Sequence, residues 1–316
     1  MRPHVLAVLG PTACGKSALG VSLARAYGGE IINCDSTAVY RGFDIGTDKP
    51  NLEARGGIPH HLIDVAEPTE VYTAAQFAQD AAAVIRDVHR RGRLPILVGG
   101  TGFYFRALTR GLFPGPGADD GLRARLARVA EARGDIRLHR MLERADPASA
   151  ARIAPRDRKR VIRALEVYLT TGRPLTEHFA DTVSPIADCE VVAVGLRLPP
   201  AVTAVRVARR VEDQFARGIV REVRDLLERG VPPVARPFGG LVYRQVMEML
   251  AGVRGEVETR ALIVRENLQY ARRQLIWFRK EPTLMWFEGP GESDGTRERV
   301  DDALAARGVQ RRGDVR

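Results

Sequence analysis

Short continuous apolar runs alternate with helical patterns along the chain, and each run ends at glycine or a polar turn. The runs predict strands over residues 4–9, 30–34, 94–98 and 190–196. Apolar residues at three- and four-residue steps predict helices over residues 18–26 and 73–91. Apolar strands that alternate with helices favour an α/β fold with a parallel sheet covered on both faces, and they place ligands at the carboxyl ends of the strands.

The alternation stops at the Pro- and Gly-rich segment 113–117. From there to about residue 180 the pattern is helical and Arg-rich, without an apolar strand. Residues 116–180 hold fourteen basic against nine acidic residues, a surplus of five in a chain whose net charge is +10. We therefore expect a helical insertion over 116–188, between a first core part at 1–115 and a second at 189–288.

The second core part has its own periodic segments. They predict helices at 202–217, 220–228, 242–250 and 259–279, and a last strand at 283–287. Residues 289–316 contain six arginines and six acidic residues, so this segment adds no net charge. We expect it to be a loosely ordered tail.

Composition limits the class of protein. No apolar stretch has the length of a membrane-spanning helix, and the N-terminus leads into a glycine loop rather than a cleavable signal. We therefore expect a cytoplasmic protein without a membrane partner. Three cysteines in 316 residues are too few for a disulfide framework, and their spacing matches no structural metal site.

The sharpest motif follows the first predicted strand. It reads Gly10-Pro11-Thr12-Ala13-Cys14-Gly15-Lys16-Ser17 and matches the phosphate-loop pattern between a strand and a helix. Its glycines let backbone N–H groups surround phosphate oxygens, Lys16 adds a positive charge, and the Ser17 hydroxyl can bind Mg²⁺. The loop recognises a polyphosphate whatever group is attached, so a kinase and a diphosphate-releasing transferase share it.

Two further polar residues follow strands of the same sheet. Asp35 comes directly after the second strand, where a carboxylate can be a magnesium ligand, a general base or an ordinary turn residue. Thr101 lies in the turn Gly99-Gly100-Thr101-Gly102, where the backbone can approach a ligand closely. An ordinary strand-to-helix turn explains Thr101 equally well.

Seven ordered blocks resemble the bacterial tRNA dimethylallyltransferases, which belong to the tRNA isopentenyltransferase family. The blocks are Gly10 to Ser17, Cys34-Asp35-Ser36, residues 44–50, residues 59–64, Gly99 to Gly102, residues 163–168, and residues 270–274 with 277–279. The resemblance runs from about Val5 to Phe287, so only the tail lies outside it.

The resemblance implies a P-loop sheet domain with an inserted all-helical domain that binds the tRNA anticodon arm. It also implies transfer of a dimethylallyl group from dimethylallyl diphosphate to N6 of adenine 37, which lies 3′ of the anticodon, in tRNAs that read UNN codons. Diphosphate is the other product, and Mg²⁺ is the implied cofactor. We take a monomer as the default state.

The resemblance also assigns roles to residues. Gly10 to Ser17 would bind the diphosphate, mainly through Thr12, Lys16 and Ser17, with Ser17 on Mg²⁺. An arginine of the predicted helix at 202–217 would also contact the diphosphate. Arg210 is the first candidate for this contact and Arg206 the second. Asp35 would be the base for the adenine amine, with Thr101 beside it. The expected tRNA-binding positions are Asp35, Ser36, Thr37, Ala38, Thr101, Arg123, Lys159, Arg160, Val161, Ile162, Arg163, Tyr243 and Arg244.

One segment departs from the family pattern. Where the family often has Gly-Tyr followed by a basic residue, this chain reads Val242-Tyr243-Arg244. We also expect aromatic or apolar side chains around Asp35 that hold an extruded base, with Tyr40 and Phe103 as candidates.

Two other functions remain compatible with the motifs. The main alternative is a P-loop kinase of a small metabolite that uses ATP, with Asp35 as base and Arg123 or Arg160 in a lid. A nucleic-acid-binding ATPase is the other, although no motif after the phosphate loop resembles those of such motors.

Overall fold

The computed structural model describes residues 2–113 and 115–311 and divides the chain into two compact units. The sheet unit comprises Met1–Thr109 and Pro185–Arg316, and the helical unit comprises Arg110–Ser184. The helical unit begins and ends somewhat before the expected limits of 116 and 188. Pro114 of the Pro- and Gly-rich segment and the last residues of the tail, 312–316, lie outside the described residues.

The sheet unit contains six parallel strands in the order β3-β2-β4-β1-β5-β6. Their bounds are β1 His4–Leu9, β2 Gly29–Asn33, β3 His60–His61, β4 Leu94–Gly99, β5 Glu190–Arg197 and β6 Leu284–Glu288. The parallel α/β class predicted from the apolar runs is confirmed. The sequence pattern did not predict β3, a two-residue strand at the edge of the sheet.

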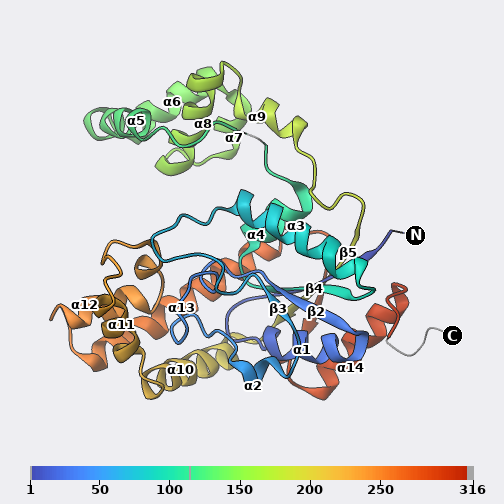
Figure 1. The fold of residues 1–316 in the computed structure, drawn as a ribbon. Coiled ribbons are helices and arrows are strands. Elements are labelled where there is room, and N and C mark those ends of the chain that lie inside the picture. Colours follow the sequence, from blue (N-terminus) through green and yellow to red (C-terminus); the bar gives the residue numbers. More distant parts are fainter. Residues whose placement is uncertain (1, 114, 312–316) are drawn as a thin grey trace. The chain divides into compact units, whose positions relative to one another are not determined.

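Helices cover both faces of this sheet, with α3 and α4 on one face and α1 and α14 on the other (Figure 1). Because strand side chains alternate between faces, Leu6 and Val8 pack into the apolar cluster of the α1 and α14 side. The helices of the unit are α1 Lys16–Tyr27, α2 Leu52–Arg55, α3 Ala74–Arg90, α4 Gly102–Arg110, α10 Pro200–Ala216, α11 Ile219–Glu228, α12 Tyr243–Leu250, α13 Glu256–Phe278 and α14 Asp294–Ala306. Within the described ranges, no helix is both long enough and apolar enough to cross a membrane.

The expectation of a loosely ordered tail is wrong for residues 294–306. They form α14, whose Val300 and Leu304 are fully buried in the same apolar cluster as β1. The helix begins after Ser293, whose side chain accepts a hydrogen bond from the Thr296 N–H. Two apolar residues four positions apart are enough to bury one face of this otherwise polar segment.

The helical unit packs around its own small core. Its helices are α5 Asp120–Arg133, α6 Asp135–Ala145, α7 Pro147–Arg152, α8 Arg158–Thr171 and α9 Leu175–His178, with a 3₁₀ turn at Phe179–Asp181. Leu138, Leu142 and Val161 are completely buried in its core. The expectation that Val161 contacts tRNA is therefore wrong, because its side chain is enclosed by the core of the unit.

A buried carboxylate joins the start of this unit to α8. Glu166 is fully buried, and it accepts hydrogen bonds from Arg123 (Nε, 2.8 Å), Arg163 (Nη1, 2.6 Å) and the Asp119 N–H (2.8 Å). Burial alone would raise the pKa of Glu166, but the hydrogen bonds from Arg123 and Arg163 hold it below its ordinary value. Arg123 and Arg163, expected on tRNA, thus also hold the unit together, and their contact with tRNA stays a prediction.

Arg123→Ala tests this role. Removing one of the two arginines leaves a buried carboxylate partly unpaired, so we expect the free energy of local opening of α5 and α8 to fall by about 2 kcal/mol. Hydrogen exchange of peptides from residues 119–171 measures it. The control, Arg125→Ala, removes an exposed arginine of the same helix and changes that free energy by less than about 0.5 kcal/mol. Equal protection in the two variants would contradict the assignment.

Candidate functional site

The phosphate loop runs from the end of β1 to the start of α1. Gly15 has a φ of 88°, and a Cβ there would lie 2.6 Å from the Gly291 nitrogen, so only glycine fits. The loop turns around the N-terminus of α1, where free N–H groups and the helix dipole favour an anion. The predicted phosphate loop therefore has the surroundings that the motif requires.

The polar side chains of the loop face one cavity. Lys16 bends back over the loop, and its Nζ donates to the Pro11 carbonyl at 2.6 Å. Thr12, Lys16 and Ser17 all line the cavity, and Ser17 is exposed to it at the start of α1. These are the residues that the sequence assigns to the diphosphate.

Two arginines of α10 hold the phosphate loop at different points. Arg210 donates to the Thr12 hydroxyl at 2.7 Å and lines the cavity. Arg206 donates to the Ala13 carbonyl at 2.6 Å and pairs with Glu292, also at 2.6 Å, and it does not line the cavity. The geometry therefore favours Arg210 over Arg206 as the arginine that meets an anion in the cavity.

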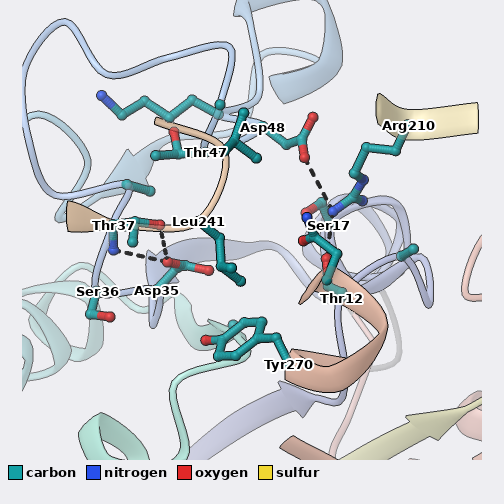
Figure 2. A pocket seen from close by; sticks show the side chains of 18 of the residues that line it. Thr12, Ser17, Asp35, Ser36, Thr37, Thr47, Asp48, Arg210, Leu241 and Tyr270 are labelled. Carbon is teal, nitrogen blue, oxygen red and sulfur yellow. Dashed lines mark hydrogen bonds and ion pairs between the residues drawn. The ribbon is translucent and has the colours of Figure 1, made fainter. Parts of the chain in front are cut away.

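Asp48 lies beside Arg210 in the segment between β2 and α2 (Figure 2). Its carboxylate is 3.2 Å from Arg210 and accepts a hydrogen bond from Gln214 at 3.0 Å. Burial raises the pKa of Asp48, although the positive charges of Arg210 and Arg217 oppose the rise. A carboxylate thus holds the arginine in place at the rim of the phosphate loop.

A buried amide from α13 connects the phosphate loop to the turn after β4. Gln274 Oε1 accepts from the Thr12 N–H at 2.8 Å, and its Nε2 donates to the Gly100 carbonyl at 2.9 Å. The ends of β4 and β2 also approach closely, since a Cβ on Gly99 would lie 2.1 Å from the Cys34 carbonyl oxygen. Three loops from the same sheet edge are thereby fixed relative to one another.

Asp35 follows β2 at this edge and faces the cavity. Its Oδ1 accepts from the Thr37 N–H at 2.9 Å and from the Thr37 hydroxyl at 2.7 Å. Thr101 does not line the cavity itself. Its hydroxyl accepts from the Ser36 N–H at 3.0 Å, so it orders the segment after Asp35. These bonds leave Asp35 Oδ2 available to accept a proton from a ligand.

The cavity is about 450 Å³ in volume and has two chemically different ends. Figure 2 shows Thr12, Ser17 and Arg210 at one end and Asp35 with Ser36 and Thr37 at the other. The side chains of Leu241 and Tyr270 lie between the two ends (Figure 2). Burial raises the pKa of Tyr270, and the negative charge of Asp35 adds to the rise, so the ring stays neutral. The cavity thus extends from the phosphate loop to the Asp35 carboxylate, and its middle section is lined by apolar and aromatic side chains.

The remaining expected positions of the sheet unit are Ala38, Tyr243 and Arg244. Ala38 lines the cavity, as Ser36 and Thr37 do. Tyr243 also lines it, but its side chain is buried, and its hydroxyl donates to Glu222 at 2.5 Å. Arg244 is paired with Glu266 at 2.5 Å and with Glu248, and its contact with tRNA stays a prediction.

In the helical unit, Lys159 and Arg160 are exposed at the start of α8. Ile162, one turn further along, is half-buried against the core of that unit. Both cations are exposed, and Arg160 also pairs with Asp157 at 3.4 Å.

The aromatic candidates were wrong. Tyr40 is buried without lining the cavity, and Phe103 is about half exposed elsewhere. Tyr270 is an aromatic residue near Asp35. The sequence analysis assigned no role to Tyr270, Asp48 or Gln274. All three lie in blocks that resemble the family, residues 44–50 and 270–274, and this resemblance was the only sequence feature that pointed to them.

The donor groups at the phosphate end fit a magnesium ion that is bound mainly through phosphate oxygens. Among the described residues, no group of three or more His, Cys, Asp or Glu side chains forms a metal cage. The Ser17 hydroxyl lines the cavity at the N-terminus of α1, which is the protein ligand that such an ion takes from a phosphate loop.

Comparison with known proteins gives a consistent result. The model of a family described as IPP transferase matches residues 38–281. A tRNA dimethylallyltransferase of Geobacter sulfurreducens is 45% identical over 298 residues, which cover 93% of this chain and 94% of that protein. One of Thermomicrobium roseum is also 45% identical, over 96% of this chain and 92% of its own length.

Two solved structures have the same fold over nearly the whole chain. A full-length tRNA isopentenylpyrophosphate transferase of Bacillus halodurans matches with a TM-score of 0.72 and 35% identity, over 97% of this chain and 96% of that one. A eukaryotic dimethylallyltransferase described as acting on tRNA matches with a TM-score of 0.81 and 27% identity, over 97% and 79% of the two chains.

Gln274→Ala tests how the cavity is held together. The substitution leaves the Thr12 N–H and the Gly100 carbonyl without their partner, so we expect Mg²⁺-pyrophosphate to bind about tenfold more weakly in calorimetric titration. The control is Gln269→Ala, which truncates an outward-facing glutamine of the same helix and leaves the affinity unchanged. Unchanged affinity in both variants would show that the phosphate loop holds its shape without α13.

Proposed function

Because the chain belongs to the IPP transferase family, we propose that it is a prenyltransferase that moves a dimethylallyl group from dimethylallyl diphosphate to N6 of adenine 37 of tRNA. Its substrates would be the tRNAs that read UNN codons, modified 3′ of the anticodon. One observation supports this most directly. The phosphate loop and Asp35 lie at opposite ends of one cavity, with Leu241 and Tyr270 between them.

The phosphate end suits the leaving group. Thr12, Lys16 and the loop N–H groups would bind the diphosphate, and Arg210 would turn from Asp48 toward it. As the allylic C–O bond breaks, negative charge collects on the diphosphate, and fixed positive groups stabilise it there. Mg²⁺ on Ser17 would add charge neutralisation at the same oxygens.

The other end suits the nucleophile. The N6 amine of adenine is a weak nucleophile because its lone pair is delocalised into the ring. As the N6–C1 bond forms and the C1–O bond breaks, N6 must lose one proton, and Asp35 Oδ2 would accept it. Thr37 holds the other carboxylate oxygen, and Thr101 orders the neighbouring Ser36, so both act as positioning residues.

The adenine must leave its stack to reach this cavity. Extrusion of a base costs a few kcal/mol, which stacking on an aromatic ring and contacts in a pocket offset. Tyr270 would supply the ring, and Ser36, Thr37 and Ala38 would contact the base. Lys159 and Arg160 of the helical unit would bind phosphates of the anticodon stem-loop, which positions the RNA without reading its sequence.

Two general features follow from the proposal. Residues of a single chain form the whole cavity, so a monomer suffices for the reaction. Because the acceptor is tRNA, we place the reaction in the cytoplasm. The small-metabolite kinase is disfavoured, since relatives that cover 91–96% of this chain are named tRNA dimethylallyltransferases.

Asp35→Asn tests the role of the carboxylate. The amide keeps the size of the side chain but cannot take the N6 proton, so single-turnover transfer of a labelled dimethylallyl group to tRNA should fall by about 10²- to 10⁴-fold. Binding of Mg²⁺-pyrophosphate and of tRNA should stay within about twofold. Glu53→Gln is the control, an exposed carboxylate outside the cavity. Full transfer by Asp35→Asn would refute the role of base.

Lys159→Ala with Arg160→Ala tests the proposed RNA contact. Without these two cations, tRNA should bind more weakly, and the slope of log K against log salt should fall by about 0.7 to 0.9 for each phosphate that the protein no longer neutralises. Arg307→Ala, which removes an exposed cation after α14 in the sheet unit, should leave the slope unchanged. A double variant with the wild-type slope would remove these cations from the interface.

A further inference from the structure

A strained turn borders the cavity just before α12. Val242 has φ 74° and ψ −58°, although a β-branched residue rarely adopts a positive φ. Such a backbone conformation costs on the order of 1–3 kcal/mol and persists only where neighbouring contacts fix it. Val242 is buried and lines the cavity, so the strain lies directly at the site.

The next residue anchors this turn. The Tyr243 hydroxyl donates to Glu222 Oε1 at 2.5 Å and accepts from the Gly46 N–H at 3.1 Å. Its ring packs edge-on against Phe43 with the centroids 4.8 Å apart. Glu222 Oε2 in turn accepts from the Ile45 N–H at 2.8 Å. Tyr243 therefore cannot shift without breaking bonds to both α11 and the segment after β2.

The residue on the other side of Val242 points into the cavity. Leu241 lies between the Asp35 end and the phosphate end, above the ring of Tyr270 in Figure 2. Because the turn is pinned at Tyr243, the backbone that carries Leu241 is held at the cavity wall. An apolar side chain at this place limits how much hydrocarbon fits between a bound diphosphate and Asp35.

We propose that Leu241, held by the strained turn at Val242, is the residue that limits the transferred isoprenoid to five carbons. This inference rests on the proposed function, because it assigns the section between Leu241 and Tyr270 to the hydrocarbon chain. A ten-carbon allylic diphosphate would react through the same bond changes: C1–O breaks, N6–C1 forms, and diphosphate leaves. Only its longer chain would collide with Leu241.

The test compares two donors on unmodified tRNA, dimethylallyl diphosphate and geranyl diphosphate. For Leu241→Ala we expect the ratio of kcat/KM for the ten-carbon donor to that for the five-carbon donor to rise at least about tenfold, the scale on which a hydrophobic pocket discriminates by size. Tyr243→Phe keeps the ring but releases the turn from Glu222 and Gly46, so its ratio should rise by a smaller factor.

Val234→Ala is the matched control. It truncates an almost fully exposed aliphatic side chain of the same region, outside the cavity, and should leave the ratio unchanged. Leu241→Val, with only one methylene fewer, keeps the test valid if the alanine variant does not fold. Its ratio should lie between those of the wild type and Leu241→Ala.

The outcomes separate the two claims. A wild-type protein that transfers no dimethylallyl group to tRNA would refute the proposed function. Normal five-carbon transfer with an unchanged ratio in Leu241→Ala, Leu241→Val and Tyr243→Phe would overturn the inference alone. A raised KM for tRNA at an unchanged donor ratio would also overturn it, since Leu241 would then contact the RNA base.

Discussion

The site depends on one constraint, which is that parallel strands bring their carboxyl ends to the same edge of a sheet. Strands β2, β4 and β1 are neighbours, so the segments that follow them meet there. The phosphate loop, the Asp35 segment and the Gly99–Gly102 turn come from residues far apart in the chain. Gln274 then joins two of these segments through a single buried amide. If these strands were not parallel, no cavity would connect the phosphate loop to the Asp35 carboxylate.

The charges at the phosphate end are arranged in two separate pairs. Arg206 and Arg210 project from the same face of α10, but each is matched to a different carboxylate, Glu292 or Asp48. Arg206 contacts the loop backbone outside the cavity, while Arg210 lines the cavity. A helix spacing of four residues therefore places one arginine against the loop and the other at the cavity. The sequence alone ranked Arg210 first without a structural reason.

Local features of the fold and the site could be predicted from the sequence. The phosphate loop and Asp35 follow predicted strands directly, so their place at the sheet edge depends only on the strands being parallel. The family resemblance added the activity, and the match of residues 38–281 to the IPP transferase family confirms that resemblance. What could not be predicted is contact between distant segments. Tyr270 and Gln274 belong to α13, whose orientation is set by packing against α10 and α12 within the sheet unit.

The contacts of the cations in the insertion could not be predicted. The family resemblance placed Arg123 and Arg163 on tRNA, and the structure shows that both also bind the buried Glu166. The sequence does not show the pairing of Arg123, because its partner is 43 residues away. The tail shows a different error. Its polar composition suggested disorder, yet Val300 and Leu304 were enough to fold α14 onto the sheet.

We propose that the phosphate loop binds the leaving diphosphate of an allylic donor rather than a nucleoside triphosphate. The most direct measurement is a reaction of purified protein with Mg²⁺, unmodified tRNA and doubly labelled dimethylallyl diphosphate, carried out without ATP. We expect the hydrocarbon label on N6 of the adenine 3′ of the anticodon, with one labelled diphosphate released for each group transferred. Label that reaches tRNA only with ATP, or ATP-dependent phosphorylation of a small molecule instead, would contradict it.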